Sequence, residues 1–159
     1  MKNLLTLSLL SFLTVSLWSA VPTDDEVISL VDQTATDVEQ NAPDTFMKIF
    51  RSQEPYLNKE NREIYVYVLR PDGKIEVHPH VGPTRTYVKD RTDAEGKKYF
   101  ENIINRSKSE PDTPGWESYK LKYPDGTFLE RKIYYKTITA SDGKQYIICS
   151  EKKVEQPGE

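Results

Sequence analysis

The sequence has few of the residues that build disulfide or zinc scaffolds. It contains 159 residues, with one cysteine, Cys149, and two histidines, His78 and His80. One cysteine allows no intramolecular disulfide, and these three side chains are too few for a closed Cys/His zinc site. The two histidines could share a strand face, but no third ligand lies near them in the sequence. We therefore expect no metal site.

Catalytic motifs are missing as well. The sequence contains no Gly-x-Ser-x-Gly, no phosphate-binding loop and no His-Glu-x-x-His, the patterns typical of many hydrolases, nucleotide-binding enzymes and zinc proteases. A lone cysteine inside an apolar strand, as Cys149 is expected to be, behaves as a small hydrophobic side chain. We expect the protein not to be an enzyme and to need no cofactor.

A basic excess is also absent. Lysine and arginine together number 22 against 25 acidic residues, so the formal net charge is −3, which argues against a nucleic-acid binder. Tyrosine, by contrast, is abundant, with ten copies against five phenylalanines and two tryptophans. Its flat apolar ring with a polar tip suits both cores and ligand pockets. The length suits a single domain.

The long apolar run lies at the start of the chain. It extends over 4–17, which is too short for a comfortable membrane span of about 20 residues. A run of this length followed by the small residues Ser19 and Ala20 is typical of a secretory signal peptide. We expect residues 1–20 to be cleaved, leaving a periplasmic or secreted protein with no stable membrane insertion. An uncleaved membrane anchor is the alternative.

Helical patterns follow the apolar run. Thr23 and Glu26 form a capping-box sequence, and apolar residues then recur at helical spacing: Val27, Val31, Ala35 and Val38. Pro43 should end this helix or restart it in a new direction, giving a second, shorter helix around 46–50. A further helix is predicted over 97–108. These helices are expected to cover a sheet.

Five strands are predicted, over 64–70, 75–78, 116–123, 128–138 and 145–152. The first is β-branched and aromatic throughout, so it should be buried on both faces. Three short turns separate neighbouring strands, and turns this short imply antiparallel pairs: Pro71-Asp72-Gly73, Pro124-Asp125-Gly126 and Ser141-Asp142-Gly143. The result is an α+β domain with a five-stranded antiparallel sheet, followed by a flexible tail over 154–159.

Three segments of the sequence carry motifs in a characteristic order. The segment VYVLRPDGKIEVHPHVG carries Asp72-Gly73, His78-Pro79 and Gly82, and DAEGKKYFENII follows it at the start of the expected middle helix. The third segment, GWESYKLKYPDGTFLERKIYYKTI, carries Gly115-Trp116, Tyr119, Lys132 and Tyr135. Together the three segments resemble the Cache family of bacterial sensor domains over about 110 residues in order. The resemblance implies a single-unit Cache domain over 21–153, with a PAS-like sheet, a long N-terminal helix and a middle helix.

The resemblance also implies a function. Cache domains are extracytoplasmic sensors that bind small metabolites, often short carboxylates or amino acids, in a pocket over the sheet. No membrane helix or signalling module follows the domain in this sequence, so a membrane receptor or sensor kinase is the expected partner. The last strand lacks a glycine often seen in the family. The alternative function is a structural or protein-interaction module that kept the fold and lost the pocket.

Lys132 is the leading candidate for a ligand contact. It lies within an expected strand among aromatic residues, and its ammonium could donate a charge-assisted hydrogen bond to a carboxylate. We expect aromatic walls from Trp116, Tyr67 and Tyr134, because Lys132 and Tyr134 share a strand face. The alternative is that Lys132 extends to a solvated edge with only its stem packed.

Four other residues complete the predicted binding site. Arg85 lies in the irregular stretch that faces the pocket in Cache domains, and His78 ends the second strand. Tyr119 is part of the family pattern. Of the two rings that open the middle helix, we expect Tyr99 to face the pocket and Phe100 to join the core.

Overall fold

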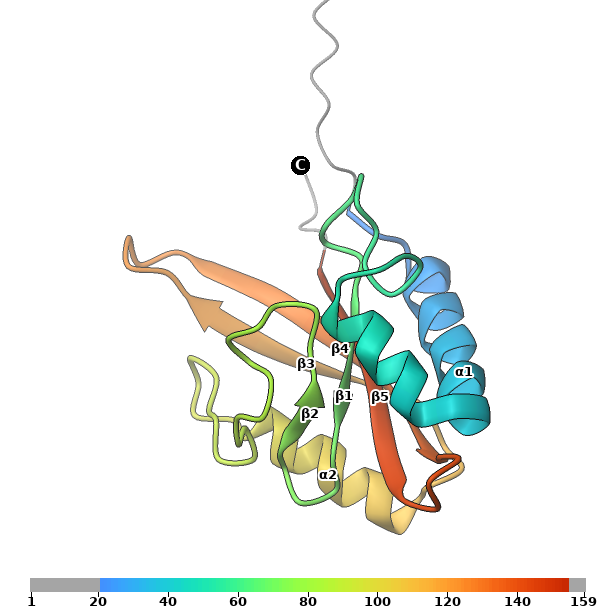
Figure 1. Ribbon diagram of the computed structural model, residues 1–159. Coiled ribbons are helices and arrows are strands. Elements are labelled where there is room, and N and C mark those ends of the chain that lie inside the picture. The colour runs from blue at the N-terminus through green and yellow to red at the C-terminus, as the bar shows by residue number, and fades with distance from the viewer. Residues whose placement is uncertain (1–20, 155–159) are drawn as a thin grey trace, which may run out of the picture.

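The structure, a computed structural model, describes residues 21–154 (Figure 1). The predicted signal peptide and all of the predicted tail except Val154 lie outside the described residues. The helices are α1, Asp24–Phe50, and α2, Tyr99–Ser109. The strands are β1, Val66–Leu69; β2, Ile75–Val77; β3, Gly115–Lys122; β4, Phe128–Thr139; and β5, Gln145–Lys153.

The five strands form one antiparallel sheet in the order β2-β1-β5-β4-β3. The predicted α+β class and five-stranded antiparallel sheet are confirmed. The first strand is shorter than the predicted 64–70, because Tyr65 makes only an isolated bridge with Leu57. All four residues of β1 are buried, as the absence of polar side chains in this segment predicts.

A kink divides α1. The capping box forms at its start, where the Thr23 hydroxyl accepts from the Glu26 N–H and the Glu26 carboxylate accepts from the Thr23 N–H. The helix is interrupted at Asn41, whose φ of −153° and ψ of 82° are not helical. The Asn41 side chain then accepts from the Asp44 N–H. The predicted restart around Pro43 therefore occurs as a bend within one element.

The sheet has a hydrophobic core on each face. One core packs α1 against the sheet through residues that include Val31, Val66 and Ile148. The other packs α2 against the opposite face through residues that include Ile103, Ile133 and Ile147. Because side chains alternate along a strand, each strand contributes to both cores. We call these two sides the α1 face and the α2 face.

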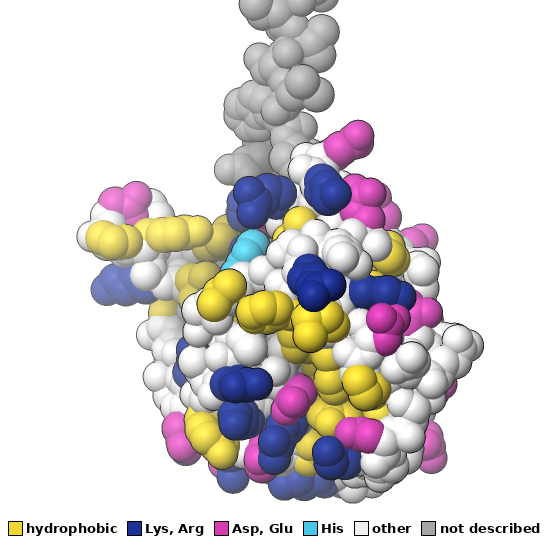
Figure 2. Space-filling model, in the orientation of Figure 1, with side chains coloured by type: hydrophobic (Ala, Val, Ile, Leu, Met, Phe, Trp, Pro, Cys, Tyr) yellow, Lys and Arg dark blue, Asp and Glu magenta, His cyan; other side chains and the backbone are white. Residues whose placement is uncertain are grey.

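The start of α1 and the end of β5 lie at the same end of the domain (Figure 1). Asp24 Oδ1 lies 3.0 Å from Lys152 Nζ, and the Val154 N–H donates to the Glu130 carbonyl. At another edge, the β3–β4 hairpin projects from the body with apolar residues exposed on it (Figures 1 and 2). Within residues 21–154, no helix is both long and apolar enough to cross a membrane.

Candidate ligand-binding site

A cavity of about 310 Å³ opens on the α2 face of the sheet. Strands β1, β2, β3 and β5 contribute to its walls, together with the first turn of α2 and the irregular segment between β2 and α2. Its lining residues are Tyr65, Tyr67, Ile75, His78, His80, Pro83, Arg91, Tyr99, Phe100, Tyr119, Leu121 and Glu151. The volume lies near the lower end of the range for small-molecule sites, about 300–1,000 Å³.

Stacked rings fix the walls of this cavity. Tyr99 from α2 and Tyr119 from β3 lie with ring centroids 4.3 Å apart and planes at 8°. Tyr67 of β1 stacks with His78, the residue after β2, with ring centroids 5.3 Å apart. All four side chains are less than 9% exposed. Neighbouring rings therefore hold one another in place, so the cavity has rigid aromatic walls.

Glu151 of β5 is the acidic residue of the lining. Its carboxylate accepts hydrogen bonds from the hydroxyls of Tyr65 and, at 3.0 Å, Tyr119. Arg131 Nη2 lies 3.4 Å from Glu151 Oε1. Burial, reinforced by the nearby Glu151 charge, raises the pKa of both tyrosines well above the usual range. The tyrosines stay neutral donors, and Arg131 balances the charge of Glu151.

His78 is buried and neutral. Its Nδ1 accepts a hydrogen bond from the His80 N–H at 2.9 Å, so the proton of the neutral ring is assigned to Nε2. Burial disfavours the charged imidazolium and lowers the pKa of His78 to about 4, with smaller electrostatic contributions from the neighbouring His80 and Arg91. At neutral pH the ring is therefore an uncharged part of the wall.

Arg91 supplies the cavity with positive charge. It comes from the irregular segment before α2 and is exposed to solvent. Within residues 21–154 no carboxylate forms an ion pair with Arg91, whereas Arg131 is paired with Glu151 and Glu63. A guanidinium can bind a carboxylate through two parallel hydrogen bonds. The lining thus combines aromatic walls with one cation that is free to meet an anion.

The structure brings four of the eight predicted site residues into this cavity and separates the other four from it. Tyr67, His78, Tyr99 and Tyr119 line it, and so does Phe100, which was expected only in the core. The residues outside it are Arg85, Trp116, Lys132 and Tyr134. The expected grouping of Tyr67 with Lys132 is wrong, because the two side chains lie on opposite faces of the sheet.

The pairing register explains this separation. Tyr67 lies opposite Cys149, which lies opposite Tyr135, so this row of side chains faces α2. Tyr134 and Trp116 form the next row, which packs into the α1 core. A shift of one residue along a strand moves a side chain to the other face. Tyr135 is therefore on the Tyr67 side of the sheet, and Tyr134 is not.

Lys132 has a partner on the α1 face. Its Nζ lies 2.6 Å from Asp24 Oδ2 and 4.4 Å from the centre of the Trp116 ring. The hydrogen bond from Lys132 holds the pKa of Asp24 below its usual range, and Lys152 adds to this effect. In the structure Lys132 and Trp116 therefore secure the beginning of α1. A ligand role for Lys132 stays an untested prediction.

Arg85 lines a different hollow, an apolar groove of about 490 Å³ on the surface. The second part of α1 and the segment after β2 form this groove, and hydrophobic side chains gather over this part of α1 in Figure 2. The groove is lined by Phe46, Met47, Phe50, Glu76, Val77, Val81, Thr84 and Arg85. It is open to solvent, and Met47, Phe50 and Val81 are exposed.

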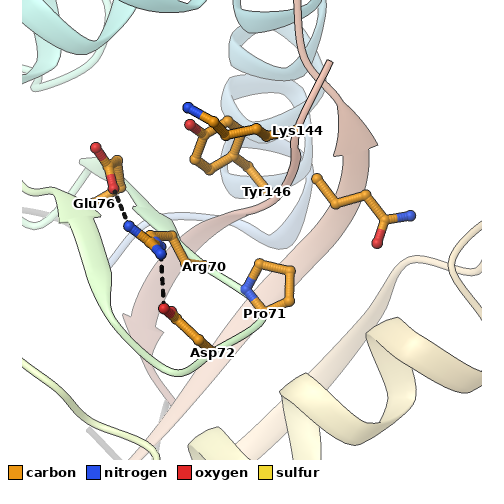
Figure 3. A pocket seen from close by; sticks show the side chains of 7 residues that line it. Arg70, Pro71, Asp72, Glu76, Lys144 and Tyr146 are labelled. Carbon is orange, nitrogen blue, oxygen red and sulfur yellow. Dashed lines mark hydrogen bonds and ion pairs between the residues drawn. The ribbon is translucent and has the colours of Figure 1, made fainter. Parts of the chain in front are cut away.

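A third hollow has the same volume as the α2-face cavity but a different chemistry. It lies beside the turn after β1 and the start of β5 (Figure 3). Arg70 points at two carboxylates, with Asp72 at 2.8 Å and Glu76 at 3.6 Å. The second cation of the lining, Lys144, is paired with Asp142 at 3.2 Å. Because both cations are already paired, the hollow offers less to an incoming anion than the α2-face cavity does.

Several lining residues were missed at the sequence level. Tyr65 precedes Tyr67 by two positions, so strand alternation could have placed both on one face. Glu151 follows Ser150 and precedes two lysines at the charged end of its strand, so its sequence context gives no signal that it faces a cavity. Arg91 and His80 lie in irregular segments without periodicity, so no sequence pattern indicates where they point.

The remaining reactive groups are poorly placed for chemistry. Cys149 is fully buried, and burial raises the pKa of its thiol well above the usual range, which disfavours the reactive thiolate. Among residues 21–154, no three histidine, cysteine or acidic side chains form a group that could hold a metal ion.

The comparisons with known proteins concern the fold. No protein-family model and no curated protein sequence matches the chain. Solved structures do match. One, described by the words "Structural basis for carboxylic acid recognition by a Cache chemosensory domain", has a TM-score of 0.59 and 14% identity, covering 82% of this chain and 92% of the other.

Two further structures have the same architecture. A "periplasmic sensor domain of chemotaxis protein" matches with a TM-score of 0.55 and 14% identity, covering 80% of this chain and 88% of the other. A methyl-accepting chemotaxis protein from Vibrio parahaemolyticus matches with a TM-score of 0.52 and 11% identity, covering 79% and 84%. The described part of the chain is thus a single domain with the PAS-like fold of Cache sensor domains.

Proposed function

We propose that this protein is a sensory ligand-binding domain that takes a small organic carboxylate into the α2-face cavity. The observation that carries the proposal is the pairing of aromatic walls with the free guanidinium of Arg91. A concave, mostly apolar pocket with a few polar groups is the usual form of a small-molecule site. The proposal is of binding and not of catalysis.

The charge balance of the cavity favours an anion. The charge of Glu151 is already balanced by Arg131, which lies 3.4 Å away outside the lining. The positive charge of Arg91 is therefore not used to balance Glu151. A carboxylate beside Arg91 would make charge-assisted hydrogen bonds, which are about twice as strong as neutral ones. The match to a domain described as recognising carboxylic acids supports the same ligand class.

A ligand screen tests the proposal. The chain from Val21 onward is heated with small carboxylates, amino acids and amines, each added separately. A carboxylate at about 100 times its dissociation constant should stabilise the fold by roughly 2.7 kcal/mol, seen as a rise in melting temperature. If no small molecule raises the melting temperature, the proposal fails, and the alternative of an interaction module is favoured.

A pair of arginine variants locates the site. Arg91→Gln should weaken binding of the best carboxylate about tenfold or more, because it removes the cation of the cavity. Arg85→Gln is the matched control, since Arg85 belongs to the same irregular segment but lines the separate groove. Equal affinity of the Arg91→Gln variant and the unchanged protein would place the ligand elsewhere.

A second candidate function, a protein-interaction module, is favoured by the exposed groove on α1. Met47 and Phe50 are 48% and 43% exposed there, beside Val81 at 71%, and contiguous exposed apolar surface is typical of contact sites. Substitution of Met47 by Glu should abolish capture of a partner from the native cell if this surface is functional, while small-molecule binding is unaffected.

We also propose that the domain is exported and presents its bound state to a membrane receptor or sensor kinase. The short apolar run before the domain and the matches to periplasmic and chemotaxis domains support this location. Mass spectrometry of the protein from its native cell should find a mature N-terminus near Val21. An intact N-terminus in the membrane fraction would instead support the uncleaved anchor.

A further inference from the structure

Rings dominate the lining of the α2-face cavity. Seven of its twelve lining residues carry an aromatic or imidazole ring, namely Tyr65, Tyr67, His78, His80, Tyr99, Phe100 and Tyr119. The rings are in mutual contact, as in the Tyr99–Tyr119 stack at 4.3 Å and the Tyr65–His80 pair at 5.5 Å. A ligand in the cavity therefore meets mainly ring faces and ring edges.

These walls suit a flat ligand. Aromatic pairs prefer offset or edge-to-face arrangements, which add attraction beyond the area they bury. A planar ring can adopt such arrangements against fixed tyrosines, whereas a saturated ring is thicker and has no π-face. A two- or three-carbon acid would leave much of the apolar wall uncovered. The shape and chemistry of the walls thus favour an aromatic body on the ligand.

The polar groups of the cavity limit which other substituents the ligand carries. Arg91 can bind a carboxylate, but the carboxylate of Glu151 already accepts from Tyr65 and Tyr119 and lies beside Arg131. The Tyr67 hydroxyl has no hydrogen-bond partner, but it is neutral and is a weaker acceptor for an ammonium than a carboxylate is. An ammonium group next to a bound carboxylate would also lie near the like charge of Arg91, while Arg131 already balances the charge of Glu151. An α-amino acid is therefore a poorer fit than the same acid without its amino group.

We infer that the cavity selects a carboxylate with a planar aromatic body and no amino group. The inference rests on the proposed function and narrows the ligand from small carboxylates and amino-acid-like compounds to one class. Arg91 holds the carboxylate, the Tyr99–Tyr119 stack forms one wall for the ring, and the occupied Glu151 discriminates against ammonium groups.

Calorimetric titration with matched compounds tests the inference. Benzoate is compared with cyclohexanecarboxylate, which has the same number of carbon atoms but is not planar, and with propionate. We expect benzoate to bind at least about tenfold more tightly than either. The second pair is 3-phenylpropionate and phenylalanine, which differ by the amino group, and we expect at least about a tenfold preference for the former.

The outcomes separate this inference from the proposed function. If propionate or cyclohexanecarboxylate binds as tightly as benzoate, or phenylalanine as tightly as 3-phenylpropionate, the inference is wrong and the carboxylate site stands. If no carboxylate binds, the proposed function fails. Benzamide, which keeps the planar body without the charge, should bind at least tenfold more weakly than benzoate.

A wall variant supplies a second test. Tyr99→Leu removes one ring of the stack. Within residues 21–154 no other side chain forms a hydrogen bond with the Tyr99 hydroxyl. The variant should weaken the affinity for benzoate about tenfold and change the affinity for propionate little. The ratio of the benzoate affinity to the propionate affinity should therefore fall, whether or not the fold becomes less stable. Tyr87→Leu is the control, because Tyr87 is 69% exposed outside the cavity. An unchanged ratio in Tyr99→Leu would overturn the role of the stack.

Discussion

Glu151 and Lys152 are neighbours in β5, and their side chains serve opposite faces of the sheet. Glu151 lines the α2-face cavity and accepts from the Tyr119 hydroxyl at 3.0 Å. Lys152 lies on the α1 face, with Nζ 3.0 Å from Asp24 at the start of α1. Two consecutive residues of β5 therefore contact the cavity on one face of the sheet and the start of α1 on the other.

Lys132→Met should affect stability and not ligand binding. Loss of the contacts with Asp24 and the Trp116 ring should lower the free energy of unfolding by about 1 kcal/mol, because the pair is partly exposed and Lys152 still reaches Asp24. Urea unfolding measures this change, and titration measures carboxylate affinity. Arg91→Gln should show the reverse pattern. A tenfold loss of affinity in Lys132→Met would return Lys132 to the binding site.

Glu151→Gln should destabilise the fold by about 2–3 kcal/mol. The charge of Arg131, whose side chain is 12% exposed, would lose its close partner, and breaking a buried ion pair leaves an uncompensated charge. Glu63→Gln is the matched control, because Glu63 is more exposed and lies 3.8 Å from Arg131; its cost should stay below about 1 kcal/mol. If urea unfolding gave the same loss of stability for Glu151→Gln and Glu63→Gln, Glu151 would not be the main partner of the Arg131 charge.

The stability of the domain should fall as the pH is lowered from about 6.5 to 4. Burial lowers the pKa of His78 from 6.5 to about 4, so in this window the unfolded chain binds a proton that the folded domain does not. The stability from His78 is present above pH 6.5 and is lost as the pH falls through 4. This difference corresponds to up to about 3 kcal/mol.

Unfolding in urea at several pH values between 4 and 7.5 measures this dependence. His78→Gln should flatten it between pH 6.5 and 5, where most carboxylates remain ionised. The His80→Gln variant keeps His78 and its backbone partner, and it should retain the dependence. A pH dependence that is the same with and without His78 would refute this explanation.

Two glycines in similar turns should respond differently to alanine. Gly73 and Gly126 both follow Pro-Asp and have φ of +92° and +89°. A Cβ at Gly73 would lie 2.6 Å from the Lys89 Cβ, whereas nothing lies within 4 Å at Gly126. Gly126→Ala should cost about 1 kcal/mol from backbone strain alone. Gly73→Ala should cost about 3 kcal/mol, because the segment around Lys89 must also move.

Differential unfolding of these two variants checks the expectation. Gly73→Ala should also weaken carboxylate binding, since Lys89 lies two residues before Arg91 in the segment that borders the cavity. Gly126→Ala should bind as the unchanged protein does. If the two variants had similar free energies of unfolding, the segment around Lys89 could move at little cost, and the expected difference would be wrong.

The sequence by itself determined the elements and their order. Capping at Thr23, the break near Pro43 and the three short Asp-Gly turns act through local sterics and hydrogen bonds, which neighbouring residues suffice to specify. Alternation along each strand also determined which residues of that strand share a face, such as Lys132 with Tyr134.

Only the tertiary structure decided which faces meet. Tyr67 and Lys132 belong to strands that are separated by β5 in the sheet, so their relation depends on two pairing registers that alternation within one strand does not fix. The observed register places Tyr67 in the same row as Cys149 and Tyr135 on the α2 face. It places Lys132 on the α1 face, where Lys132 forms an ion pair with Asp24. Arg91 lies in an irregular segment without a repeating pattern, so its place at the cavity follows from packing between distant parts of the chain.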